Sequence, residues 1–157
     1  MILNLKHLNE YVKYHHFKME SLQSAIHLMT EGCYMASIDL KDAYYSIPVA
    51  LEHRKFLQFL WGPNVYQYTC LPNGLASAPR IFTKLMKPIY SALRGHGLQS
   101  VAYIDDSLLF GDTYEECCGN VQATVQMMTN TGFMIHERKS VFTPTQRITF
   151  LGFVLDS

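Results

Sequence analysis

Apolar residues recur every three or four positions in three long segments, and this spacing predicts an amphipathic helix in each of them. Ser21 is a candidate N-cap for the first helix, and Pro79 suits the first turn of the second. Gly32, Gly95 and Gly132 stand at the three ends as expected stop signals. The predicted helices are residues 21–30, 78–95 and 114–129.

Short runs rich in β-branched and aromatic residues lie between these helices and predict strands. The turn sequence Trp61–Asn64 separates two of the runs, which predicts a β-hairpin. Pro48 argues against a long helix after the strand that ends near Asp39. Helices combined with an antiparallel sheet define an α+β fold. The expected strands are residues 1–6, 34–40, 56–60, 65–69, 100–104, 107–110, 133–136, 140–142 and 148–154.

The composition is that of an ordinary folded domain. The 157 residues are 48% hydrophobic and 13% aromatic, which is enough to bury one core. Charged residues make up only 17%, which argues against a disordered chain. No repeat, low-complexity tract or Gly/Ser linker divides the sequence, so we expect one domain. The formal net charge of zero neither favours nor excludes nucleic-acid binding.

The cysteines and histidines show no metal-binding pattern. The four cysteines form no C-x-x-C pair, and the absence of a signal peptide predicts reduced thiols in an intracellular protein of the cytoplasm or nucleus. Adjacent His15 and His16 would face opposite sides of a strand, so we expect a surface loop there. No apolar run reaches the ~18 residues of a membrane span, so no membrane association is expected.

Three aspartates suggest chemistry. Asp39 is expected at the end of a strand, and Asp105-Asp106 in a tight turn between two short strands. If these strand ends meet, the carboxylates repel one another, and divalent cations such as Mg²⁺ relieve that repulsion. Such a site suits two-metal phosphoryl transfer. An Asp-Asp pair alone is typical of a plain β-turn, so this hypothesis depends on the other segments.

Five segments carry a further signal: residues 37–44, 71–82, 103–106, 131–140 and 150–153. In this order they resemble motifs A to E of reverse transcriptases. Their amino-acid sequences are most similar to those of LTR-type and tyrosine-recombinase-type retrotransposon polymerases. The resemblance implies a polymerase palm, an antiparallel ferredoxin-like sheet with helices packed on one face, plus a partial fingers segment. It also implies an RNA-directed DNA polymerase, which adds deoxynucleotides from their triphosphates to the 3′-hydroxyl of a primer on an RNA or DNA template.

The resemblance also implies the residues of the active site. Asp39, Asp105 and Asp106 would bind two Mg²⁺ ions, with Mn²⁺ as the alternative, and the backbone carbonyl of Leu40 would complete the coordination. Lys139 matches the lysine proposed to protonate pyrophosphate, which is general acid catalysis. Lysine is equally common on solvated faces, so this role stays open at the level of sequence.

Further positions follow from the same resemblance. Tyr44, five positions after Asp39, matches the aromatic ring that excludes a ribose 2′-hydroxyl by steric clash, and its alternative is core packing. Asn73 and Gly74 would lie beneath the incoming nucleotide, although relatives often carry Gln or Phe in place of Asn. Four residues would contact the primer, unless the last three simply belong to a buried strand: Tyr103, Phe150, Leu151 and Gly152.

The resemblance divides the chain into parts. Residues 1–33 and about 49–77 would be partial fingers, residues 34–48 and 78–149 palm, and residues 150–157 the start of the primer-grip hairpin. The triphosphate-binding basic residues, the thumb and the RNase H region fall outside this sequence. We therefore expect a truncated piece of a larger polyprotein, whose missing fingers, thumb and RNase H regions would be its partners.

Two other functions remain open. A non-catalytic palm remnant that binds nucleic acid or a partner would retain the fold without activity, and the absent triphosphate clamp favours it. An RNA-templated RNA polymerase would use a similar palm, but Tyr44 argues against this because a ribonucleotide needs room for its 2′-hydroxyl. Activity of this chain on its own is left open by the sequence.

Overall fold

The computed structural model describes residues 3–157, and they separate into two compact units. The first unit contains the chain up to Phe17 together with Asp42–Phe82, and the second contains Lys18–Lys41 and Thr83–Ser157. The chain therefore passes between the units three times, and none of the crossings carries the Gly/Ser linker that would have marked it in the sequence. The boundaries of palm and fingers remain predictions.

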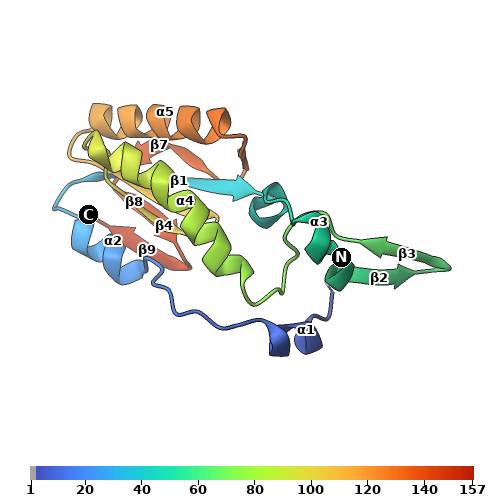
Figure 1. Ribbon diagram of the computed structural model, residues 1–157. Helices are drawn as coiled ribbons and strands as arrows, with labels where there is room; N and C mark the ends of the chain where they lie inside the picture. Colours follow the sequence, from blue (N-terminus) through green and yellow to red (C-terminus); the bar gives the residue numbers. More distant parts are fainter. Residues whose placement is uncertain (1–2) are drawn as a thin grey trace. The chain divides into compact units, whose positions relative to one another are not determined.

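The second unit is built on a five-stranded antiparallel sheet, which confirms the predicted α+β class (Figure 1). The strand order is β4-β5-β1-β6, and β7 also pairs with β1. The strands are β1 (Tyr34–Lys41), β4 (Ser100–Tyr103), β5 (Asp106–Gly111), β6 (Met134–Ile135) and β7 (Val141–Thr145).

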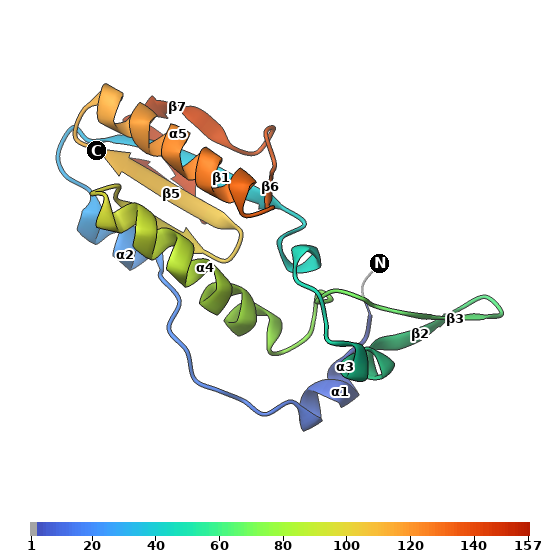
Figure 2. The same ribbon diagram turned by 45° about the horizontal axis from the view of Figure 1, so that its top comes forward.

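Opposite faces of this sheet pack against different elements. Ser107 meets Tyr90 of helix α4 (Ala78–Gly95) through their hydroxyls, and α5 (Tyr114–Asn130) lies along β5 and β1 (Figure 2). The neighbouring Leu108 points the other way and belongs to a core cluster with Ala25 of α2 (Leu22–Leu28). The hairpin of β8 (Arg147–Phe150) and β9 (Phe153–Asp156) contributes to the same cluster.

The junction of β5 and α5 leaves no room for a side chain at Gly111. A Cβ atom built there would lie 2.3 Å from the backbone nitrogen of Cys117 and 2.8 Å from its Cα atom. Thr113 caps the helix just beyond, accepting a hydrogen bond from the Glu116 backbone N–H at 3.2 Å. Glycine at the end of β5 therefore permits α5 to start close against the sheet.

The first unit is smaller and contains the hairpin predicted around Trp61–Asn64. β2 and β3 pair as expected around the turn Gly62-Pro63, and most of their residues are exposed. Phe59 stacks on Tyr66 with ring centroids 5.7 Å apart. The elements are α1 (Lys6–Tyr11), the 3₁₀ turn η1 (Ala43–Ser46), α3 (Leu51–Arg54), the 3₁₀ turn η2 (Lys55–Leu57), β2 (Gln58–Trp61) and β3 (Asn64–Gln67).

Two strand predictions are wrong. The strand expected at residues 1–6 begins outside the described residues; within them, residues 3–5 form no strand and α1 starts at Lys6. The strand expected at 148–154 is instead the β8–β9 hairpin, because Leu151 and Gly152 adopt positive φ values of 50° and 81° and reverse the chain. The three helices predicted from periodicity are confirmed, and each of their ends lies within two residues of the predicted position.

The remaining expectations concern single residues. All four cysteines are free thiols, with Cys33 and Cys117 buried. His15 and His16 lie exposed in an irregular segment, as predicted. In the described part of the chain, no helix is long and apolar enough to cross a membrane.

Candidate active site

Asp39 is placed by β1, the central strand of the sheet. The buried side chains of Ile38 and Leu40 flank it on the opposite face of the strand, so the alternation of β1 turns Asp39 away from α4 and α5. Across the ladder, Asp39 is the partner of Asp106, the first residue of β5. Opposite residues of an antiparallel pair project to the same face, which brings the two carboxyl groups together.

Asp105 and Asp106 are presented by the tight turn between β4 and β5. Tyr103 pairs with Asp106, so only Ile104 and Asp105 form the loop. Ile104 has a φ of 54°, a left-handed conformation that is strained for a β-branched residue. The Leu40 backbone N–H donates to the Asp105 carbonyl at 2.9 Å and ties the turn to β1. The sequence prediction that a strand end and a hairpin bring these aspartates together is thus confirmed.

The carboxyl groups influence one another's protonation. Partial burial, and then the charges of Asp105 and Asp39, raise the pKa of Asp106 to about 6, and a hydrogen bond to Asp39 adds to this by favouring the protonated form. Burial is also the largest cause that raises the pKa of Asp105, with the Asp39 charge acting in the same direction. The site therefore holds more negative charge than its protein surroundings compensate.

Lys139 supplies the positive charge nearest to Asp39. Its Nζ lies 3.6 Å from Oδ2 of Asp39, although the lysine side chain is 62% exposed. The Lys139 charge lowers the pKa of both Asp105 and Asp106, against the larger raising effects. Lys139 and Asp106 thus both lie beside Asp39, and the charges of Asp39 and Lys139 act on Asp105, but the structure does not test the role of Lys139 as an acid.

Ser140 holds the backbone of Asp39 and was not singled out from the sequence. Its hydroxyl accepts from the Asp39 N–H and donates to the His136 carbonyl, each at 3.0 Å. The His136 N–H in turn donates to the Asp39 carbonyl at 2.8 Å. Ser140 lies directly after Lys139 in the segment that resembles motif D, and this adjacency was the signal available in the sequence.

The donor set suits a hard divalent cation. Carboxylate oxygens are the ligands that Mg²⁺ prefers. Burial is the largest cause of the raised pKa of Asp106, and the charges of Asp105 and Asp39, which a cation would offset, add to it. Among residues 3–157, however, no three His, Cys, Asp or Glu side chains are grouped so that they could hold a metal by themselves. Mg²⁺ is usually held by one or two carboxylates plus substrate phosphates and water, so the aspartates fit such an ion without forming a complete cage.

The predicted nucleotide-binding residues all lie in the first unit. Tyr44 is half-buried and meets Phe82 edge-on, with ring centroids 5.7 Å apart, so it has at least the packing role expected as its alternative. Asn73 is exposed, and its Nδ2 donates to the Tyr45 hydroxyl at 3.1 Å. Gly74 has a φ of 92°, which favours glycine.

Asn9 of α1 holds the loop around Gly74 and was missed by sequence reasoning. Its Nδ2 donates to the Gly74 carbonyl at 2.9 Å, and its Oδ1 accepts from the Ala76 N–H at 2.8 Å. These two bonds span 65 and 67 positions of sequence, and nothing in the local pattern signals them.

The residues predicted to contact a primer differ in exposure. Phe150 is 3% exposed and belongs to the core, as its alternative interpretation supposed. Gly152 is exposed in the β8–β9 turn, and Leu151 beside it is half-buried. Tyr103 is half-buried at the end of β4. The hypothesis of primer contact therefore depends on Tyr103 and on the turn rather than on the Phe150 ring.

A sheet centred on paired aspartates, with a two-residue turn carrying a third, is the arrangement of a nucleotide polymerase palm. The family model described as "Reverse transcriptase (RNA-dependent DNA polymerase)" matches residues 1–155. The chain belongs to the reverse transcriptase family, whose members generally use divalent metals.

The curated relatives are polyproteins of viruses and transposons. The chain is 33% identical to the Gag-Pro-Pol polyprotein of Human T-cell leukemia virus 2, over 78% of this chain and 9% of the relative. It is 27% identical to Polyprotein P3 of Commelina yellow mottle virus, over 97% of this chain and 8% of the relative. The Tf2-3 transposon polyprotein of Schizosaccharomyces pombe is 26% identical, over 98% of this chain and 11% of the relative. This last match agrees with the predicted likeness to LTR-type retrotransposons.

Solved structures show the same fold. A foamy viral protease-reverse transcriptase in complex with double-stranded DNA matches with a TM-score of 0.88 at 20% identity, over 99% of this chain and 27% of that one. A second foamy viral structure, in complex with an RNA/DNA hybrid, matches with a TM-score of 0.84. The chain therefore spans about a tenth of the curated relatives and about a quarter of the first matched structure.

Proposed function

We propose that this chain is the catalytic centre of an RNA-directed DNA polymerase, which adds deoxynucleotides from their triphosphates to a primer 3′-hydroxyl on an RNA or DNA template. The observation that carries the proposal is the pairing of Asp39 with Asp106 across β1 and β5, with Asp105 in the adjoining turn and the pKa of both Asp105 and Asp106 raised. Family membership supports the same reaction class. The matched structures that contain DNA or an RNA/DNA hybrid support nucleic acid as the partner.

Asp39, Asp105 and Asp106, with the Leu40 carbonyl, are the proposed ligands of two Mg²⁺ ions, for which Mn²⁺ could substitute. When bound, these ions would activate the 3′-hydroxyl and stabilise the leaving pyrophosphate. The chain's own residues prepare the site: β1 and the β4–β5 turn fix the carboxylates, and the Lys139 ammonium can donate a proton to pyrophosphate as it leaves. The long side chain of Lys139 is exposed enough to move from Asp39 toward such a group.

Selection of the sugar is assigned to Tyr44, with Asn73 and Gly74 beneath the nucleotide. A ring held by Phe82 cannot yield easily, so a ribose 2′-hydroxyl that met it would clash. The primer is assigned to Tyr103 and to the turn Leu151-Gly152. Fingers, thumb and RNase H regions of a larger polyprotein are the proposed partners of the chain, in keeping with the share of its relatives that it spans.

Primer extension in a chimera tests the proposal directly. The chain replaces the corresponding residues of the foamy viral protease-reverse transcriptase, which has been solved in complex with double-stranded DNA. We expect deoxynucleotide incorporation on an RNA template, and a loss of more than roughly 100-fold with Asp105→Asn, beyond the range typical of groups that only orient metal ligands. Equal incorporation by the chimera and its Asp105→Asn variant would overturn the assignment.

The alternative is a non-catalytic palm remnant, and the same chimera separates the two functions. A remnant would bind the primer–template duplex in a gel-shift assay yet incorporate no nucleotide with either Asp or Asn at position 105. A matched control, Asp112→Asn, changes an exposed aspartate at the far end of β5 and should leave incorporation unchanged.

A further inference from the structure

A carboxylate outside the candidate active site forms a hydrogen bond with the edge strand of the β4–β5 hairpin. Glu20 lies just before α2, and its Oε2 accepts the backbone N–H of Ala102 on β4 at 2.6 Å. β4 is an edge strand of the sheet, so its outward N–H groups have no neighbouring strand to bond in the described part of the chain. Glu20 thus supplies the acceptor that a further strand would otherwise provide.

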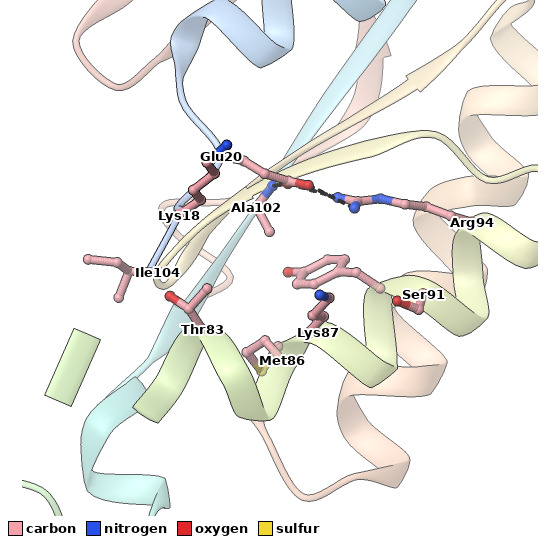
Figure 3. Close-up of a pocket in the computed structure, with 10 residues that line it drawn as sticks. Lys18, Glu20, Thr83, Met86, Lys87, Ser91, Arg94, Ala102 and Ile104 are labelled. Carbon is pink, nitrogen blue, oxygen red and sulfur yellow. Dashed lines mark hydrogen bonds and ion pairs between the residues drawn. The ribbon is translucent and has the colours of Figure 1, made fainter. Parts of the chain in front are cut away.

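Arg94 near the end of α4 holds the Glu20 carboxylate in place. Its Nη1 lies 2.7 Å from Oε1 of Glu20 and its Nη2 lies 2.8 Å from Oε2, a two-point contact that fixes the carboxylate's orientation. The same Nη2 donates to the Ser100 carbonyl at 2.9 Å. Figure 3 shows Glu20 and Arg94 meeting across the strand beside Ala102. We call Glu20, Arg94 and the Ala102 N–H the edge latch.

The edge latch acts one step away from the aspartates. Ala102 pairs with Ser107, and the next pair along the hairpin is Tyr103 with Asp106. Ser107 is held from α4 by the Tyr90 hydroxyl, so both strands are restrained at the same rung. The latch residues and Ile104 also line one cavity of about 260 Å³ (Figure 3), which leaves space beneath the turn. A turn that contains a strained residue and borders open space needs restraint from its strands.

We infer that Glu20 is a positioning residue: held by Arg94, it fixes edge strand β4 and thereby the geometry of Asp105 and Asp106. The inference rests on the proposed function insofar as those aspartates bind a metal. The edge latch does not touch the reacting atoms, and its effect reaches them through the backbone of the hairpin.

Amide hydrogen exchange on the full chain tests the restraint without any metal. Glu20→Ala removes both contacts and should speed exchange of residues 100–106, with α5 unchanged as a sign of intact folding. Glu20→Gln keeps an oxygen for the Ala102 N–H but weakens the contact with Arg94 by removing the charge, so exchange of residues 100–106 should rise by less than in Glu20→Ala. Glu31→Ala, at an exposed glutamate of the same unit, is the matched control.

Mn²⁺ titration followed by electron paramagnetic resonance tests the consequence. Glu20→Ala should weaken Mn²⁺ binding by up to about 10-fold, the lower end of the effect of groups that bond metal ligands directly, with partial rescue in Glu20→Gln and no change in Glu31→Ala. Wild-type exchange rates and wild-type Mn²⁺ affinity in Glu20→Ala would overturn the inference. If Glu20→Ala did not fold, Glu20→Gln would decide. Amide exchange of residues 100–106 in Glu20→Gln at the rate of unprotected amides would overturn the hydrogen-bonding role of Glu20.

The two assays also separate this inference from the proposed function. If Mn²⁺ binding by wild type did not depend on Asp39, Asp105 or Asp106, the metal site would be wrong. The exchange of residues 100–106 would still decide whether Glu20 restrains β4.

Discussion

The two hairpins β2–β3 and β4–β5 share a turn geometry but differ in what surrounds them. Each has a two-residue loop whose first residue has a positive φ, 59° at Gly62 and 54° at Ile104. Glycine adopts this conformation freely, whereas isoleucine is strained in it. Within residues 3–157, β2–β3 pairs with no further strand and is largely exposed, while β5 is almost wholly buried between β4 and β1.

The difference shows how the surrounding structure stabilises a strained turn at Ile104, next to the aspartates. An isolated hairpin has only its turn and its cross-strand pairs to define it, so an unstrained turn is needed. In β4–β5, the sheet and the edge latch determine the strand positions, and the turn must follow. Strained turns of this kind occur where the surrounding structure over-determines them, and at functional sites they fix side chains in set directions.

The largest test of the comparison removes one leucine from each hairpin. Leu108 of β5 is fully buried, and Leu108→Ala should lower the free energy of unfolding by about 2–5 kcal/mol because it leaves a cavity. Leu60 of β2 is 73% exposed, and Leu60→Ala should cost less than about 0.5 kcal/mol. Urea denaturation measures both changes, and similar costs would contradict the contrast.

The next test concerns the close contact at the end of β5. Gly111→Ala should destabilise the chain by about 1–3 kcal/mol, because the added methyl group collides with backbone atoms of Cys117. Gly119→Ala, inside α5 where the new Cβ would meet no described atom within 4 Å beyond its chain neighbours and the nearby helix backbone, should instead stabilise by up to about 1 kcal/mol. Thermal unfolding compares the two, and effects of the same sign would show that the packing has been misread.

Exchanging the turn residues should have opposite effects in the two hairpins. Gly62→Ala should cost about 1–2 kcal/mol, because a side chain must then adopt a left-handed conformation. Ile104→Gly should relieve comparable strain and gain about 1 kcal/mol, less what the lost side-chain contacts contribute. A loss of stability in Ile104→Gly as large as that in Gly62→Ala, by chemical denaturation, would mean that the turn at Ile104 is not strained.

The last expected effect is a pH dependence of stability that originates at Asp106 in the β4–β5 hairpin. The folded pKa of Asp106 is raised from 3.8 to about 6, so the native state binds more protons than the unfolded state between these values. The free energy of unfolding should therefore fall as pH rises from about 4 to about 6. Asp106→Asn should flatten this slope in unfolding curves taken across that range, and a slope that persisted unchanged would point to other groups.

Sequence periodicity was sufficient for the elements that place Asp39 and Asp106. β1, β5 and the turn between β4 and β5 have alternating or buried runs bounded by polar residues, so their local pattern and their final structure agree. α1 was missed because none of its residues is buried, and it is held instead by hydrogen bonds from Asn9 to a distant loop.

The restraints on the active site could not be read from the sequence. Glu20 and Ala102 are 82 positions apart, and a glutamate before a helix looks like any exposed charge. Nothing about Ile104 suggests a positive φ, since β-branched residues rarely adopt it. Likewise, a leucine at position 151 does not indicate a turn, although its φ of 50° helps to divide the strand predicted at 148–154. Tertiary contacts impose all three features.

The most direct test of the central claim is Mn²⁺ binding by the full chain, followed by electron paramagnetic resonance at pH 7.5 and pH 5. The account predicts binding at pH 7.5 that weakens at pH 5, as protons compete for Asp106, and that is lost in an Asp39→Asn/Asp106→Asn double variant. Binding of equal strength in wild type and the double variant, or its absence from the wild type at pH 7.5, would contradict the account.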